Sequence, residues 1–134
     1  MISAKVYISG PISGIRREHY VERFRLAEQM LRSLGYDNIV NPTRVWACRF
    51  QKLYSLIRLV FGEQRAYTLI LLYDLWLLSR CQRIYKIPGW KDSRGAQIES
   101  AVAYNYNMFL INRHERTAID GSIEKLIKKQ EGKS

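Results

Sequence analysis

The chain has 134 residues, of which 47% are hydrophobic, and this length suits a single domain with a buried core. Lysine and arginine outnumber aspartate and glutamate by 22 to 12, so the formal net charge of +10 favours an anionic partner, with phosphate compounds the obvious class. Charged residues interrupt the most hydrophobic stretch, 53–78, and its longest uncharged run is far shorter than the ~20 residues of a membrane-spanning helix, so we expect no membrane span.

The first half of the chain predicts two strands and three helices. Residues 4–9 resemble a buried strand that runs into a glycine-containing loop at 10–14, and an amphipathic helix follows at 20–34 with Gly35 as its C-cap. A second short strand at 39–40 ends in a turn at Pro42. Two helices are then predicted at 46–60 and 66–80, with Gly62 marking the break between them.

The second half continues the alternation of strands and helices. A strand at 83–87 stops at Pro88, and a loop at 90–94 leads to a helix at 93–106. A buried strand at 108–111 and a closing helix at 122–129 complete a single domain of residues 1–129, and residues 130–134 are expected to form a frayed tail. This alternation predicts an α/β fold with a parallel sheet covered on both faces and an active crevice at the carboxyl ends of its strands.

Two carboxylates occupy helix faces that are otherwise apolar. The residues three, four and seven positions from Glu99 on its predicted helix are Ala96, Val102, Ala103 and Tyr106. Asp74 repeats the pattern on the helix at 66–80, among leucine, isoleucine and tyrosine residues. Burying a carboxylate is costly and raises its pKa, which is typical of groups that do chemistry in a pocket. From the pattern alone, Glu99 would equally suit an exposed place on a frayed helix, and Asp74 a buried acid satisfied by hydrogen bonds.

The cysteines and the N-terminus indicate a cytoplasmic protein. Cys48 and Cys81 have neither metal-ligand spacing nor the density of a disulfide scaffold, so we expect free thiols in a reducing compartment. The chain enters its first strand without the basic region and apolar core of a signal peptide.

Several short motifs follow one another in a specific order along the chain. They are VYISGPISG at 6–14, Asn41-Pro42, Asp74, Cys81, Ile84-Tyr85, Pro88-Gly89-Trp90, Ser93, Gly95-Ala96 and Glu99. This set closely resembles the nucleoside 2-deoxyribosyltransferase-like superfamily and, within it, the small DUF4406 group common in bacteria and their phages. The resemblance covers nearly the whole chain.

The resemblance implies a flavodoxin-like or Rossmann-like three-layer sandwich with a mainly parallel sheet of four to five strands. It implies cleavage, by hydrolysis or transfer, of the N-glycosidic bond of a 2′-deoxynucleoside or its 5′-monophosphate, and we expect no metal or organic cofactor. Glu99 matches the family's nucleophile, in agreement with the ability of a carboxylate to form a glycosyl ester. Asp74 matches the acid that carries the proton for the leaving base, and Tyr7 matches the tyrosine that orients the nucleophile.

The other matching residues are expected to bind the substrate. Gly10 and Gly14 would let the substrate approach the backbone closely. Ser93 stands where the related 2′-deoxynucleotide N-hydrolases have a serine that helps to hold the 5′-phosphate, at a predicted helix N-terminus that favours an anion. Together with Arg16 and Arg17, Ser93 favours a nucleotide over a nucleoside. The predicted substrate-binding residues are Ser9, Gly10, Pro11, Ile12, Ser13, Gly14, Arg16, Arg17, Trp90, Ser93 and Gly95.

Two other functions and one assembly state also follow from these features. The chain could be a catalytically inactive nucleotide-binding module that serves as a sensor or docking site, or a basic protein that binds nucleic acid. Family members commonly complete the pocket with residues of a neighbouring subunit, and the region 46–76 is rich in apolar and aromatic residues. We therefore expect a homo-oligomer.

Overall fold

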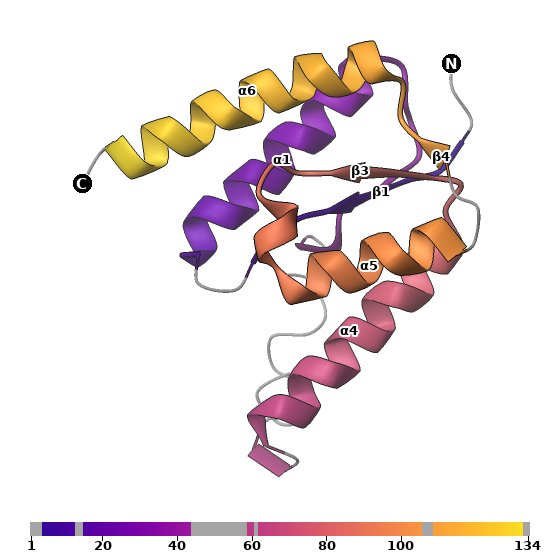
Figure 1. The fold of residues 1–134 in the computed structure, drawn as a ribbon, viewed down its shortest axis with the longest axis vertical. Coiled ribbons are helices and arrows are strands. Elements are labelled where there is room, and N and C mark those ends of the chain that lie inside the picture. The colour runs from indigo at the N-terminus through magenta and orange to yellow at the C-terminus, as the bar shows by residue number, and fades with distance from the viewer. Residues whose placement is uncertain (1–3, 13–14, 44–58, 61, 106–108, 133–134) are drawn as a thin grey trace.

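The computed structural model describes residues 4–12, 15–43, 59–60, 62–105 and 109–132 (Figure 1). Strands and helices alternate along these residues, and the predicted helix at 46–60 lies almost wholly outside them. The elements in chain order are β1 (Val6–Ser9), α1 (Arg17–Ser33), β2 (Ile39–Val40), α4 (Glu63–Ser79), β3 (Arg83–Lys86), the 3₁₀ helix η1 (Trp90–Asp92), α5 (Arg94–Asn105), β4 (Phe109–Leu110) and α6 (Arg113–Gly132).

The four strands form one parallel sheet in the order β2-β1-β3-β4. The chain passes from β1 to β2 on one side and then crosses to β3 on the other side of β1. In such open parallel sheets, ligands bind at the carboxyl ends of the strands where the order reverses, which here is between β1 and β3. The register pairs Tyr7 with Ile84 and Ser9 with Lys86 across this point. The predicted parallel α/β fold, with its flavodoxin-like strand order, is confirmed.

Successive side chains of β1 point to opposite faces of the sheet, so both faces are apolar, and helices cover each of them. Val6 and Ile8 pack with Phe24 of α1 and Ile119 of α6 in one buried cluster. Tyr7 faces the other way, toward a second cluster formed by α4, α5 and β3. Figure 1 shows α1 and α6 on one side of the strands and α4 and α5 on the other. The starts of α1 and α5 both lie at the end of the sheet where β1 and β3 finish (Figure 1).

The edge strand β4 differs from its prediction. The sequence predicts a buried strand at 108–111, but Phe109 and Leu110 of β4 are 69% and 44% exposed, and only Ile111 is buried among the three described residues. The reason is position, because β4 is the last strand of the sheet and pairs only with β3. An apolar run predicts burial on average and cannot show which strand lies at the edge.

The closing helix α6 is longer than predicted at both ends. It spans Arg113–Gly132 where the sequence predicts 122–129, so residues 130–132, which the sequence analysis assigns to the tail, continue the helix. The side chain of Gln130 explains this order, since Nε of Arg23 donates to Gln130 Oε1 at 2.8 Å and Gln130 Nε2 donates to the backbone oxygen of His19 at 3.1 Å. Within the described residues, no helix has the length and apolarity to cross a membrane.

Candidate functional site

Glu99 lies at the centre of a buried polar cluster between α5 and β1. It is only 6% exposed, and Ala96 and Ala103 are buried beside it on the same helix face, as the sequence predicts. These small side chains let α5 lie close to the sheet, so the longer glutamate reaches the strand. Tyr7 donates its hydroxyl hydrogen bond to Glu99 Oε2, and Ser9 Oγ donates to Glu99 Oε1 at 2.8 Å.

The two donors occupy alternate positions of β1 and therefore point to the same face of the sheet. The hydrogen bond from Tyr7 is the one that the resemblance implies. The contact from Ser9 was not predicted, because Ser9 was expected to bind substrate. A strand places residues i and i+2 on the same face, so once Tyr7 is expected near Glu99, Ser9 is expected near it as well. Each carboxylate oxygen thus has one fixed donor and keeps one further acceptor site.

Burial and hydrogen bonding act in opposite directions on Glu99. The pKa of Glu99 is raised from 4.5 to about 7, because the effect of burial outweighs that of the hydrogen bonds from Tyr7 and Ser9, which lower it. The pKa of Tyr7 is raised well above 10.0 by burial first and then by the charges of Glu99 and Asp74. Tyr7 therefore keeps its proton and acts as a donor, and Glu99 changes charge near neutral pH. A carboxylate poised in this range is typical of groups used for catalysis.

Asp74 of α4 is buried on the same side of the sheet as Glu99. Its neighbour one turn later, Leu78, packs in the cluster that contains Tyr7 and Cys81. The effect of the Asp74 charge on the pKa of Tyr7 shows that the carboxylate and the phenol are close enough to interact. The structure therefore places all three residues that were predicted to be catalytic, Glu99, Asp74 and Tyr7, on the same side of the sheet, and it joins Tyr7 to Glu99 by a hydrogen bond.

The loops after β1 and β3 meet at the same edge of the sheet, as predicted. A Cβ atom on Gly10 would lie 2.9 Å from Cβ of Ile87, and a Cβ atom on Gly89 would lie 3.6 Å from Pro11. Gly10 is therefore required for packing against Ile87, the residue after β3, which is a different reason from the predicted approach of substrate. Gly89 also has a φ of 94°, a conformation that favours glycine. Ile12 is half-buried, and the predicted residues Ser13 and Gly14 lie outside the described residues.

Ser93 caps the helix that carries Glu99. Its buried Oγ accepts a hydrogen bond from the backbone N–H of Ala96 at 3.4 Å, so α5 begins as the sequence predicts. Gly95 lies in the first turn of α5 and is half-buried. Trp90, in a segment predicted as a loop, belongs to η1 and has Nζ of Lys86 4.1 Å from its ring centroid.

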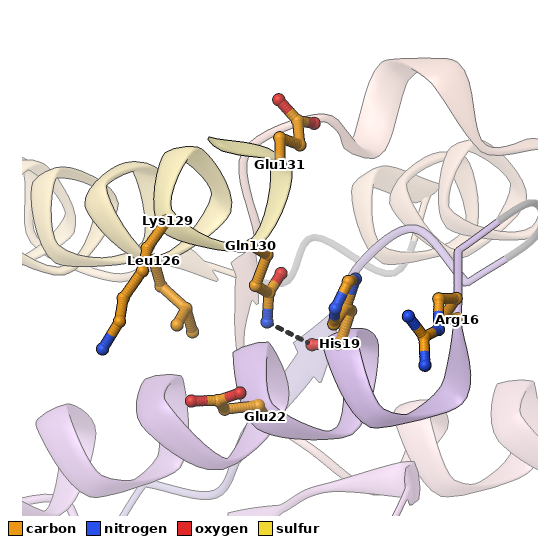
Figure 2. A pocket seen from close by; sticks show the side chains of 7 residues that line it. All are labelled: Arg16, His19, Glu22, Leu126, Lys129, Gln130 and Glu131. Atoms are coloured by element: carbon orange, nitrogen blue, oxygen red, sulfur yellow. Dashed lines mark hydrogen bonds between the residues drawn. The ribbon is translucent and has the colours of Figure 1, made fainter. Parts of the chain in front are cut away.

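Arg16 and Arg17 lie at the start of α1 and are exposed. Arg16 forms an ion pair with Glu18 at 2.8 Å and lines a groove of about 530 Å³ between the start of α1 and the end of α6 (Figure 2). The lining consists of Arg16, His19, Glu22, Leu126, Lys129, Gln130 and Glu131. Neither Tyr7 nor Glu99 belongs to this lining, so the groove is separate from the buried carboxylate cluster.

Metal ligands and reactive thiols do not stand out in the described part of the chain. No group of three or more histidine, cysteine, aspartate and glutamate side chains there could hold a metal ion. Cys81 is a free, buried cysteine, and burial raises the pKa of its thiol to about 11, which keeps it protonated at neutral pH. Cys48 lies outside the described residues.

Comparison with known proteins identifies the family. The model of the family described as "Domain of unknown function (DUF4406)" matches residues 4–112, from the residues before β1 to the end of the sheet, so the chain belongs to that family. No curated protein and no solved structure matches the chain.

Proposed function

We propose that this DUF4406 protein cleaves the N-glycosidic bond of a 2′-deoxynucleoside 5′-monophosphate or a 2′-deoxynucleoside, with Glu99 as the nucleophile. The observation that carries the proposal is the buried Glu99 carboxylate, which two hydroxyl donors hold at the switch point of a parallel sheet. The motifs that resemble the nucleoside 2-deoxyribosyltransferase-like superfamily supply the substrate class.

The proposed reaction has two displacement steps. An oxygen of ionised Glu99 attacks the anomeric carbon of the deoxyribose, so a carbon–oxygen bond forms as the carbon–nitrogen bond to the base breaks. The sugar is then held as an ester of Glu99. Attack by water on the anomeric carbon gives hydrolysis, and attack by a second base gives transfer. Either one breaks the ester bond and restores the Glu99 carboxylate, and the proton that the attacking group loses passes to the ionised Asp74. Tyr7 and Ser9 orient the carboxylate, and their hydrogen bonds favour its ionised form.

Asp74 is proposed to supply the proton that the leaving base needs. Its carboxyl group is buried near Tyr7, on the face of the sheet where Glu99 lies. Enzymes that cleave glycosidic bonds with a covalent intermediate commonly use two carboxyl groups, one as the nucleophile and the other as the acid. Replacement of Asp74 by asparagine should therefore slow release of poor leaving groups more than release of activated ones.

A panel of deoxynucleosides and their 5′-monophosphates, with released base measured by chromatography, tests this function. We expect release of base from at least one of these compounds. A second base added to the reaction distinguishes transfer from hydrolysis. Binding of these compounds without release of base would instead support an inactive nucleotide-binding module. Strongly salt-dependent binding of DNA, with no small-molecule turnover, would support a nucleic-acid-binding protein.

A further inference from the structure

Lys86 is the last residue of β3 and lies next to the Glu99 cluster without belonging to it. In the sheet register it is opposite Ser9, which donates a hydrogen bond to Glu99. Its half-buried side chain places Nζ 3.3 Å from Oγ of Ser100, the residue that follows Glu99 on α5. The ammonium group thus lies at the carboxyl edge of the sheet, between the strand and the helix that form the proposed active site.

Trp90 and a second lysine surround this ammonium group. Nζ of Lys86 lies 4.1 Å from the centroid of the Trp90 ring, and Nζ of Lys91 lies 5.8 Å from the same centroid. Both distances are in the range of cation–π attraction, which holds the flexible lysine side chains near η1. Trp90 therefore contacts two positive charges at this edge of the sheet, and the charge of Lys91 acts on Lys86.

The described surroundings of Lys86 are positively charged. Burial lowers the pKa of Lys86, and the charges of Arg116 and Lys91 lower it further. Across residues 4–12, 15–43, 59–60, 62–105 and 109–132, no carboxylate forms an ion pair with Lys86. Cations that are partly removed from water and repel one another gain most from an anion that enters between them.

The hydrogen-bonding capacity of Lys86 indicates which anion fits. An ammonium group has three N–H donors, and the Ser100 hydroxyl uses one of them. The remaining donors and the nearby Lys91 suit a compact group with several oxygens and a charge near −2, which describes a phosphoryl group at neutral pH.

We infer that Lys86, held by Trp90 and Ser100 and assisted by Lys91, binds a phosphoryl group at the carboxyl edge of the sheet beside Glu99. If the phosphoryl group is the 5′-phosphate of the substrate, the inference rests on the proposed function and makes Lys86 a determinant of nucleotide specificity. The other source of the same chemistry is free phosphate. Arg16 lines the separate groove between α1 and α6, so Lys86 is better placed than Arg16 for this role.

The test measures binding in a Glu99→Gln background, in which turnover does not disturb the measurement. Calorimetric titrations use a deoxynucleoside, its 5′-monophosphate and inorganic phosphate. Lys86→Met removes the charge and keeps the length of the side chain, and Lys86→Arg keeps the charge. Lys125→Met, at an exposed site on α6, is the matched control for the loss of one positive charge. Thermal unfolding of each variant verifies that it is folded.

Lys86→Met should weaken binding of the monophosphate about ten- to hundredfold, as expected for a charge-assisted hydrogen bond, and leave the deoxynucleoside unchanged. Lys86→Arg should recover most of the loss, and Lys125→Met should have no effect. An equal loss for nucleoside and nucleotide would overturn the inference, because Lys86 would then act only through the packing of Trp90. Equal affinities for phosphate-bearing ligands in Lys86→Met and Lys125→Met would also overturn it.

The phosphate titration separates failure of this inference from failure of the proposed function. If neither the nucleoside nor the nucleotide binds but inorganic phosphate binds in a Lys86-dependent way, the inference holds and the proposed substrate class is wrong. If base is released by the unsubstituted protein but Lys86→Met changes no affinity, the proposed function stands and the inference fails. Absence of binding for all three ligands overturns the inference.

Discussion

Tyr7 and Tyr85 lie on neighbouring strands, point to opposite faces of the sheet, and each donate a hydrogen bond to a carboxylate. Tyr7 donates to Glu99 of α5, and Tyr85 donates to Asp120 of α6 at 2.6 Å. Both tyrosines are fully buried. The Tyr85–Asp120 pair thus provides a control for the Tyr7–Glu99 pair, because it has the same chemistry on the face of the sheet that lacks Glu99.

Tyr7→Phe should lower the release of base at pH 7 by about tenfold or more, because the lost hydrogen bond favours the ionised form of Glu99. The same loss raises the pKa of Glu99, so the rising limb of the pH–rate profile should move to higher pH. Rates measured from pH 5 to 9 test both effects. Tyr85→Phe should leave the rate of base release and its pH profile unchanged. An equal decrease in rate for the two variants would mean that Tyr7 acts only by stabilising the fold.

The contribution of Glu99 to the free energy of unfolding should fall as pH rises from about 4.5 to 7. Glu99 has a pKa of about 7 when folded and near 4.5 when unfolded, so the unfolded chain loses its proton first and is favoured between these values. The full effect is about 3 kcal/mol at pH 8 relative to pH 4.5. Glu99→Gln removes this contribution.

Urea denaturation at pH 4.5 and pH 8 measures that contribution as a difference between proteins. Relative to the unsubstituted protein, Glu99→Gln should gain stability on going from the lower to the higher pH. A constant difference between Glu99→Gln and the unsubstituted protein at both pH values would mean that Glu99 does not titrate in this range.

We predict that 5′-monophosphates are better substrates than free nucleosides. Ser93 caps the helix that carries Glu99, and the helix dipole at this end favours an anion. Ser93→Ala should lower kcat/KM for the monophosphate by about one to two orders of magnitude and change the nucleoside rate little. Because Ser93 also caps α5, the variant should lose about 1 kcal/mol of stability, so rates are compared well below its Tm. Equal efficiency for both substrates in the unsubstituted protein would refute the assignment.

We also predict a homo-oligomer, because apolar side chains remain exposed on neighbouring elements of one face. Leu69, Leu72 and Trp76 of α4 and Tyr104 of α5 are all exposed. Such a surface is unusual for a monomer and typical of an interface. Multi-angle light scattering at micromolar concentration should give at least twice the chain mass of 15.8 kDa, and Trp76→Lys should reduce it. A mass of 15.8 kDa for the unsubstituted protein would contradict the prediction.

The sequence predicts the position of Glu99 better than it predicts the surroundings of that residue. Helical periodicity places Glu99 on an apolar face, and the structure buries it there. The donors to Glu99 come from β1, and such contacts depend on how α5 lies across the sheet, which periodicity within one helix does not encode. The same limit applies to Gly10, because the side chain that leaves no room for a Cβ atom there belongs to Ile87, which is distant in the sequence.

The overall fold is predicted more completely than its edges. Alternating strands and helices predict the parallel sheet, and the four strands of the sheet lie where the sequence predicts them. The exposure of β4 depends on its place at the edge of the sheet. The helical state of residues 130–132 depends on the hydrogen bonds of one glutamine side chain. Neither feature produces a periodic pattern in the sequence.

The most direct test of the central claim compares base release by Glu99→Gln and Asp120→Asn with that of the unsubstituted protein. Both substitutions turn a carboxylate that accepts a tyrosine hydrogen bond into an amide, but only Glu99 is proposed to form the ester. Glu99→Gln should remain folded and lose turnover by several orders of magnitude, roughly 10³-fold or more, while Asp120→Asn retains it. Turnover near that of the unsubstituted enzyme in a folded Glu99→Gln protein would contradict the proposed mechanism.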